Sequence, residues 1–204
     1  MMWVELTKAV LIGYLLGSVP FALVIGKVFF KKDIRTAGSK NLGGGNAGRV
    51  LGAKAGLAVM TLDILKVSLA IWMVSGSEYG ERVMILAGLA AAIGHCYPVF
   101  AGFKGGKAVA TMYGFLFGMA VCGSYSLWIF LIPLISFLIV LYMGKIISLS
   151  SIMSAVVSTL FLYFAVGSVP MAMASLVFTV LIIVRHRTNI VKMIRKEENK
   201  VTWM

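Results

Sequence analysis

Three polar segments with chemically active side chains interrupt an otherwise apolar chain: residues 37–49, 94–107 and 185–189. The first two are rich in glycine, which lets the backbone approach a ligand closely and turn its amides toward it. All three carry lysine or arginine, and cationic donors beside such amides bind anions, most often phosphate. The segments therefore predict binding sites for a phosphorylated small molecule.

Two short patterns in these segments look like nucleotide-binding motifs but lack the required surroundings. Gly43-x-Gly45-x-x-Gly48 has the glycine spacing of a dinucleotide site, yet the sequence around it predicts no βαβ unit. Lys104-Gly105-Gly106-Lys107 lacks the Walker spacing, and Ala108 stands where serine or threonine is required. We therefore expect phosphate binding without nucleotide hydrolysis. The alternatives are a flexible turn for the first segment and a topology-setting basic turn for the second.

The two histidines are the candidate proton-transfer groups. His95 precedes the Lys104 cluster, and a structural role and a catalytic role are both open for it. His186 lies between Arg185 and Arg187, so we expect a neutral imidazole that hydrogen-bonds a hydroxyl or a phosphate, with Asn189 close by.

The acidic residues exclude one class of chemistry. The chain holds only seven of them, and outside the C-terminal tail Asp33 alone lies near the basic segments. That is too few for a Mg²⁺ site built on several aspartates, so we expect no metal ion and no cofactor. Neither histidine begins a His-x-x-x-x-Asp acyltransferase pair. Catalysis must then depend on cationic stabilisation and on positioning.

The composition predicts an all-α polytopic membrane protein formed by a single domain, residues 1–204. Hydrophobic residues make up 60% of the chain, the mean hydropathy is +0.98, and only 13% of residues are charged. Apolar runs of about 18 or more residues can cross a bilayer as helices. We expect seven spans, near residues 3–30, 55–75, 81–100, 107–121, 125–143, 148–166 and 171–184.

The basic residues predict the orientation of these spans. Lys31, Lys32 and Arg35 follow the first span, which places the N-terminus outside and all three polar segments, with the C-terminus, in the cytoplasm. The net charge of +12 is then a topology signal, with contacts to anionic lipid of the bilayer. No stacking platform or groove-entering helix accompanies it, so we expect no nucleic-acid partner.

Asp63 and Lys66 are charged residues inside the second span. They lie three residues apart, on one helical face, where a buried ion pair avoids the cost of lone charges in the membrane. A structural pair is the favoured interpretation, and a proton or ion relay is the alternative.

Taken together, these motifs resemble the bacterial membrane acyltransferases that move an acyl chain from acyl-phosphate to glycerol 3-phosphate, the PlsY family. Nearly the whole chain takes part in the resemblance. The matching elements are Gly17-Ser18-x-Pro20-Phe21 with Gly26-Lys27, Gly38-Ser39-Lys40-Asn41-Leu42-Gly43-Gly44-Gly45-Asn46, Gly94-His95-x-x-Pro98-Val99-Phe100 with Phe103-Lys104-Gly105-Gly106-Lys107-Ala108-Val109-Ala110-Thr111, Ser148-Leu149-x-Ser151, and Arg185-His186-Arg187-x-Asn189-Ile190. Lys40, Gly45 and Ala108 depart from the family pattern, which has glycine, threonine and glycine there.

The resemblance implies the first acylation step of phospholipid synthesis, from acyl-phosphate and glycerol 3-phosphate to lysophosphatidic acid and phosphate. It implies a multi-pass protein of the bacterial inner membrane whose active site faces the cytoplasm. The enzyme that produces acyl-phosphate is a candidate partner. The expected catalytic residues are Ser39, Lys104, His186 and Asn189. The expected phosphate-binding residues are Ser39, Asn41, Gly43, Asn46, Arg49, Lys104, Gly105, Gly106, Lys107, Ser148, Arg185 and Arg187. A transporter of a phosphorylated metabolite or lipid is the alternative function.

Overall fold

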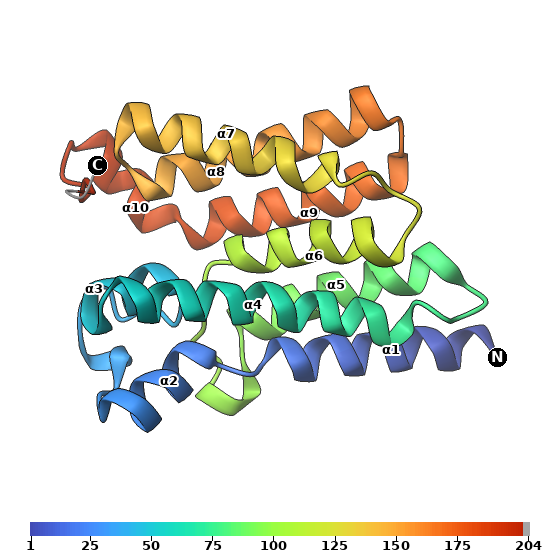
Figure 1. Ribbon diagram of the computed structural model, residues 1–204, viewed down its shortest axis with the longest axis horizontal. Helices are drawn as coiled ribbons and strands as arrows, with labels where there is room; N and C mark the ends of the chain where they lie inside the picture. The colour runs from blue at the N-terminus through green and yellow to red at the C-terminus, as the bar shows by residue number, and fades with distance from the viewer. Residues whose placement is uncertain (202–204) are drawn as a thin grey trace. The chain divides into compact units, whose positions relative to one another are not determined.

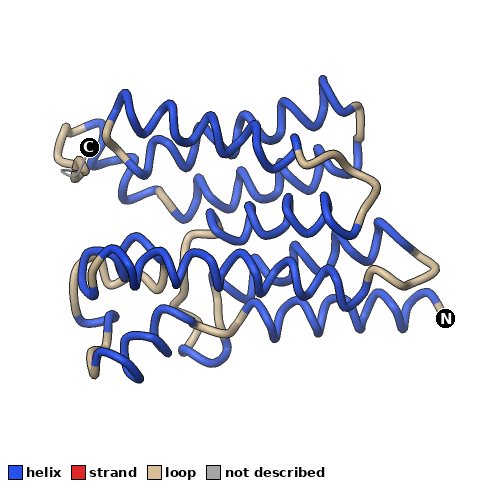
Figure 2. The backbone as a smooth tube through the Cα atoms, in the orientation of Figure 1, coloured by secondary structure: helices blue, strands red, loops and turns tan. Residues whose placement is uncertain are grey.

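The computed structural model describes residues 1–201, and every regular element in that range is a helix (Figure 1, Figure 2). This confirms the all-α prediction. The backbone divides into two compact units, Met1–Ser124 and Tyr125–Met204. A single domain over residues 1–204 stays a prediction.

The first unit contains the first two polar segments. Its elements are α1 (Met2–Gly17), α2 (Phe21–Phe30), the short 3-10 helix η1 (Ile34–Thr36), α3 (Gly44–Leu51), α4 (Ala53–Val74), α5 (Gly80–Cys96), the 3-10 helix η2 (Val99–Ala101) and α6 (Val109–Cys122). Helix α1 packs along α5, while α4 packs against α3 and α6 (Figure 1). The first polar segment therefore joins α2 to α4, and the second joins α5 to α6.

Small residues let α1 and α5 approach until their backbones touch. A Cβ added at Gly13 or Gly17 would overlap the backbone of Ala87 or Ala91 on α5. Such contacts are a common way to associate helices in a bilayer, where burial of apolar surface provides little driving force. The close α1–α5 pair brings the end of α5, where the second polar segment begins, beside the end of α1.

The first span is broken between α1 and α2, where Pro20 cannot donate a backbone hydrogen bond. The carbonyl of Val19, in this break, accepts a hydrogen bond from Lys66 Nζ at 2.9 Å. Lys66 also forms the expected ion pair with Asp63 at 2.7 Å, which confirms the pair predicted from their spacing.

Helix α3 lies within the first polar segment, outside the seven spans that the sequence predicts as helices. The helix begins with Gly44 and Gly45, although each glycine disfavours a helix by about 1 kcal/mol relative to alanine. Tertiary packing overrides this propensity, because α3 crosses α4 at Gly48 and Gly56. A Cβ at Gly56 would lie only 2.7 Å from the Gly48 Cα.

The second unit is a helical bundle with a polar seam. Its elements are α7 (Trp128–Gly144), α8 (Ile147–Phe161), the π-helical turn η3 (Leu162–Val166), α9 (Val169–Arg185) and α10 (Arg187–Ile194). Ser175 Oγ donates to Ser158 Oγ at 3.0 Å, and Thr179 Oγ1 donates to the Ala155 carbonyl at 2.9 Å. These bonds join α9 to α8 inside the bundle, where a lone hydroxyl would have no water to bind.

The C-terminal part of this unit also differs from expectation. The sequence analysis placed a charged tail after the third polar segment, whereas that segment begins α10. Helices α9 and α10 meet at His186 with a bend of 61°.

Four helical stretches are long and apolar enough to cross a membrane: Met2–Phe30, Ala53–Val74, Gly80–Ala101 and Ile147–Val166. The bent pair α9–α10 makes a fifth candidate. Helices α6 and α7 are apolar but shorter, with 14 and 17 residues. Every expected span coincides with one of these helices, yet a straight helix of 14 residues reaches only about 21 Å, less than the hydrocarbon thickness. The count of seven and the orientation therefore stay predictions.

Two of the described helices end at a lysine in the left-handed conformation that normally favours glycine. Lys31 ends α2 with φ 53°, and Lys145 ends α7 with φ 54°. Lys40, in the first polar segment, has φ 59°.

Candidate active site

Asn46 organises the first polar segment from inside α3. Its side chain is 3% exposed, and its Oδ1 accepts a hydrogen bond from the Ser39 amide at 2.7 Å. Its Nδ2 donates to the carbonyls of Ile34 and Ala37 at 3.0 and 3.2 Å. One buried amide thus holds the backbone of residues 34–39 in place, so Ser39 is exposed on a fixed turn.

The backbone of this turn explains why the family pattern has glycine at the position of Lys40. Lys40 takes φ 59°, a left-handed conformation in which a side chain is disfavoured. Ala108, which also replaces a family glycine, precedes α6 with φ 63°. At Gly45, where the family has threonine, an added Cβ would meet nothing within 4 Å.

The second polar segment folds back onto the end of α5. The amide of Gly106 donates to the His95 carbonyl at 2.9 Å, and that of Gly105 donates to the Cys96 carbonyl at 3.2 Å. A Cβ at Gly106 would overlap the His95 ring, and one at Gly105 would lie 2.8 Å from the Cys96 carbonyl oxygen. Only glycine fits this contact, which accounts for the Gly105-Gly106 pair between the two lysines.

The first two polar segments contact one another directly. Asn41 Nδ2 donates to the Gly105 carbonyl at 3.3 Å, a long hydrogen bond that spans 64 residues of sequence. The structure therefore brings together the predicted ligands of these two segments within the first unit.

Two cations of this cluster have no anionic partner in the described part of the chain. Arg49, in the last turn of α3, and Lys104 are exposed, and neither forms an ion pair within residues 1–201. Lys107 is half-buried. Cations without an anionic partner suit a phosphate dianion.

Asp33, the acidic residue nearest the first polar segment, is already neutralised by local cations. Its carboxylate accepts hydrogen bonds from the Arg35 side chain and backbone amide, and Lys27 Nζ lies 3.9 Å away. The Arg35 side-chain bond is the main reason that the pKa of Asp33 is lowered to about 2. Asp33 therefore caps η1 as a carboxylate and is unsuited to accept a proton at neutral pH.

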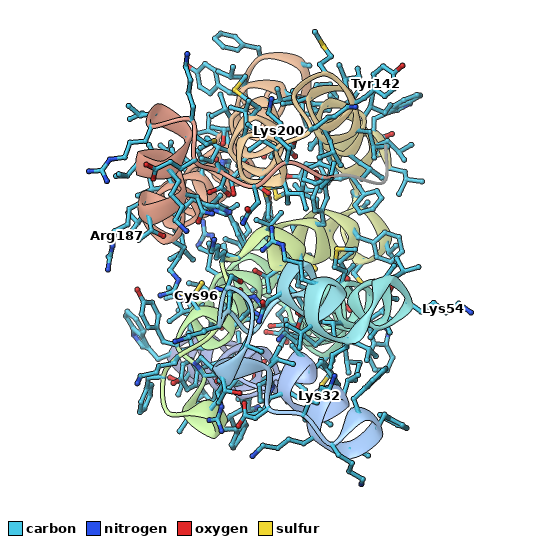
Figure 3. All side chains as sticks on the ribbon, turned by 90° about the vertical axis from the view of Figure 1, so that its left-hand side faces the viewer. Lys32, Lys54, Cys96, Tyr142, Arg187 and Lys200 are labelled. Carbon is cyan, nitrogen blue, oxygen red and sulfur yellow. The ribbon has the colours of Figure 1, made fainter. Side chains whose placement is uncertain are left out.

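The third polar segment defines the tautomer of His186. The buried ring places Nδ1 2.9 Å from the carbonyl oxygen of Ile182, which can only accept a hydrogen bond. Nδ1 therefore carries a proton, and in the neutral ring Nε2 is the acceptor. Arg185 is half-buried, whereas Arg187 is exposed and points away from the ribbon (Figure 3).

A carboxylate from the C-terminal tail holds two predicted site residues of the second unit. Glu198 Oε1 accepts hydrogen bonds from Ser148 Oγ and Asn189 Nδ2, both at 2.7 Å. The structure thus brings Ser148 and Asn189 together although they are 41 positions apart. Sequence reasoning missed Glu198, because a glutamate within a charged tail carries no distinguishing pattern.

The chain resembles known proteins over nearly its whole length. The family model described as glycerol-3-phosphate acyltransferase matches residues 7–196. A glycerol-3-phosphate acyltransferase of Geobacillus kaustophilus is 43% identical over 193 residues, which cover 95% of this chain and 94% of that protein. One of Listeria welshimeri is 40% identical over 205 residues and covers both chains completely.

Two solved structures resemble the chain over nearly its whole length. One is described as PlsY, an integral membrane glycerol 3-phosphate acyltransferase, in its glycerol 3-phosphate form; it has 36% identity and a TM-score of 0.88, covering 97% of this chain and 96% of that one. The lysophosphatidic acid form has 35% identity and a TM-score of 0.86, covering 97% and 95%.

Proposed function

Because this chain belongs to the glycerol-3-phosphate acyltransferase family, we propose that it transfers a fatty acyl group from acyl-phosphate to the 1-hydroxyl of glycerol 3-phosphate. The products are 1-acyl-glycerol 3-phosphate, which is lysophosphatidic acid, and inorganic phosphate. The observation that carries this proposal is the joining of two glycine-rich cationic segments through Asn41 and Gly105. The acceptor and the product agree with the two forms in which the related PlsY was solved.

The proposed substrates each carry a phosphate group, which the cations of the polar segments suit. In the first unit Arg49, Lys104 and Lys107 provide charge, while the backbone from Ser39 to Gly43 and the Gly105-Gly106 pair provide shape. In the second unit Arg185 and Arg187 provide charge beside His186. The sequence resemblance implies a role in this reaction for each of these two sets of residues.

The reaction forms one bond and breaks one bond at the acyl carbon. The acceptor O1 attacks the carbonyl carbon of acyl-phosphate, the bond from that carbon to the bridging oxygen breaks, and phosphate leaves with its electron pair. Acyl-phosphate is already activated, so the enzyme needs to align the two substrates and stabilise the charge that develops on the departing phosphate. Cations are the appropriate groups for this task.

The proton of the acceptor hydroxyl needs a base, and two groups are available. Neutral His186 has its acceptor lone pair on Nε2, because Nδ1 donates to the Ile182 carbonyl. The departing phosphate is itself the second candidate. We propose Asn189 as the group that orients the hydroxyl, with its own amide anchored by Glu198.

Acyl-phosphate is proposed as the donor from the family resemblance and from the absence of a nucleotide motif in the sequence. A smaller donor needs no adenine pocket, whereas acyl-CoA does. A membrane enzyme that uses acyl-phosphate needs a supply of it, so we propose the acyl-phosphate-producing enzyme as a partner.

The direct test is phosphate release by purified protein in detergent, given palmitoyl-phosphate with and without glycerol 3-phosphate. We expect release that depends on the acceptor, with lysophosphatidic acid formed in equal amount. Product formed from palmitoyl-CoA or acyl-carrier protein, but not from palmitoyl-phosphate, would overturn the donor assignment. Folded protein that is inactive with all three donors would overturn the proposed reaction and direct attention to transport assays.

Removal of single cations tests the proposed site. Lys104→Ala and Arg49→Ala should each lower kcat/KM by about 100-fold, as expected for loss of one group that stabilises transition-state charge. Lys54→Ala is the matched control, since Lys54 is exposed on α4 and points away from the ribbon (Figure 3). Full activity of Lys104→Ala would contradict the phosphate-binding role of the second segment. Full activity of His186→Ala would leave the substrate phosphate as the base.

We propose the bacterial inner membrane as the location, with the polar segments in the cytoplasm. Basic residues at the inner ends of the expected spans support this orientation. A membrane-impermeant maleimide applied to intact cells should label Glu78→Cys, in the expected outer turn, and should label Lys40→Cys only after lysis. The reverse pattern would invert the topology.

A further inference from the structure

A buried cluster of three ionisable side chains lies in the first unit, apart from the proposed chemistry. Asp63, Lys66 and His95 are 1%, 4% and 5% exposed. Lys66 Nζ lies 2.7 Å from Asp63 Oδ1 and 3.2 Å from His95 Nδ1. The expected ion pair of α4 is therefore a cluster of three, completed by a histidine from α5.

The contacts of Lys66 determine the tautomer of His95. A lysine ammonium has three donors and no acceptor, and Asp63 Oδ1, the Val19 carbonyl oxygen and His95 Nδ1 all lie within 3.2 Å of Lys66 Nζ. His95 Nδ1 must then accept, so the neutral ring carries its proton on Nε2. The distance of 3.6 Å from His95 Nδ1 to Asp63 Oδ1 is too long for a competing hydrogen bond.

The other edge of the His95 ring faces the second polar segment. The ring atoms nearest to a Cβ built at Gly106 are Nε2, Cε1 and Cδ2 of His95. The backbone of His95 also accepts the Gly106 amide at 2.9 Å. His95 therefore supports the segment between Lys104 and Lys107 with both its ring and its carbonyl.

We propose that Asp63, Lys66 and His95 form a positioning cluster that holds the Gly105-Gly106 backbone in the shape that binds substrate phosphate. Asp63 and Lys66 fix the orientation and tautomer of the His95 ring, and the ring seats the Gly106 backbone. The ligand is a phosphate monoester or acyl-phosphate group, and this inference rests on the proposed function. None of the three side chains is assigned a proton-transfer step.

A purely structural ion pair has different consequences from a positioning cluster. Loss of a structural pair lowers stability in general, whereas loss of the positioning ring changes the polar segment in protein that is still folded. Loss of the ring should leave the chemical step largely intact, because the positioning role gives the ring a contact with the Gly105-Gly106 segment and none with the reacting atoms.

The experiment compares His95→Ala and His95→Gln with wild-type protein in detergent, using palmitoyl-phosphate and glycerol 3-phosphate. Glutamine places an amide donor near the position of the imidazole Nε2, so it is the conservative variant. Ser68→Ala is the matched control, because Ser68 donates from the same helix, α4, to the Gly114 carbonyl at 2.9 Å, away from the segment. KM is measured for each substrate in turn, and hydrogen exchange is measured at residues 105 and 106.

For His95→Ala we expect KM for one phosphate substrate to rise about tenfold, because the ring that packs against the Gly106 backbone is lost, with kcat changed by less than about threefold. The Gly105 and Gly106 amides should exchange faster than in wild type. In His95→Gln, both KM and the exchange rates should return most of the way to the wild-type values. Unchanged KM for both substrates, or a fall in kcat alone, would overturn the positioning role.

A second variant keeps the inference testable if His95→Ala does not fold. Asp63→Asn with Lys66→Met removes both charges together, so no lone charge is left buried, and it should reproduce the rise in KM and in exchange at Gly106. Folded double variant with wild-type KM and exchange would refute the role of the pair. The exchange measurement needs no substrate, so it separates failure of this inference from failure of the proposed reaction, which inactive wild-type protein would reveal.

Discussion

Replacement of Asn46 by alanine should unlock the first polar segment while leaving the helices intact. The side chain is buried and makes three hydrogen bonds, to the Ser39 amide and to the carbonyls of Ile34 and Ala37. Alanine is a good helix former, so α3 itself has no reason to unwind. The damage is therefore confined to residues 34–39.

The magnitude follows from the three bonds. At about 1 kcal/mol net for each hydrogen bond, the segment loses about 3 kcal/mol of local stability. Because 1.4 kcal/mol corresponds to a factor of ten, the open form of the segment becomes about 100-fold more populated. The Ser39 amide should then exchange with solvent about 100-fold faster, and kcat/KM should fall by a smaller factor, because activity follows the fraction of molecules in which Ser39 is still fixed.

Hydrogen exchange of the peptide that contains Ser39 is the primary assay, and acceptor-dependent phosphate release is the second. Asn41→Ala is the matched control for exchange, since the one side-chain hydrogen bond of Asn41 within residues 1–201 goes to the Gly105 carbonyl, not to Ser39. Two results would refute the reasoning that Asn46 holds the segment. One is exchange at Ser39 that is equally fast in Asn46→Ala and in wild type, and the other is exchange that is faster in Asn41→Ala than in Asn46→Ala.

Three further predictions follow from local geometry. Lys40→Gly should raise the free energy of unfolding by about 1 kcal/mol by relieving the left-handed backbone, whereas Lys40→Ala, which keeps a Cβ, should bring no such gain; thermal unfolding in detergent measures both. Glu198→Ala should lower stability by about 2 kcal/mol and reduce activity by releasing Asn189, while Glu197→Ala, at an exposed neighbouring position, should change neither. The pKa of Asp33 is lowered from 3.8 to about 2, so its ionised form stabilises the fold above about pH 4 and this contribution is lost as the pH falls through 2. The stability difference between wild type and Asp33→Asn, measured from pH 7 to pH 2, should shrink only in that acid range.

The helices were predictable because apolar runs and their interruptions are local signals. The break at residues 17–20 contains Pro20, and the seven expected spans each coincide with a helix of the structure. Helix α3 was not predictable, because two glycines at its start argue against a helix, and only packing of Gly48 on Gly56 makes it favourable. That contact depends on α4, which follows α3 in the sequence and crosses it in space.

The candidate site shows the same division between local and distant information. Glycines and cations indicated phosphate binding because their chemistry is visible in short segments. The acceptor role of His95 Nδ1 was not visible, because it depends on Lys66, 29 residues earlier. Glu198 was missed for a related reason, since its two partners belong to α8 and α10.

The lysines that end helices in a left-handed conformation connect folding to membrane insertion. Glycine at Lys31 or Lys145 would end α2 or α7 with less backbone strain, but it would carry no charge. During synthesis, a positive charge at such a boundary keeps that end of the helix on the cytoplasmic side, before any tertiary contact exists. In the orientation proposed above, these positions trade equilibrium stability for correct insertion. A glycine variant at either position would be more stable once inserted and more often inserted the wrong way round.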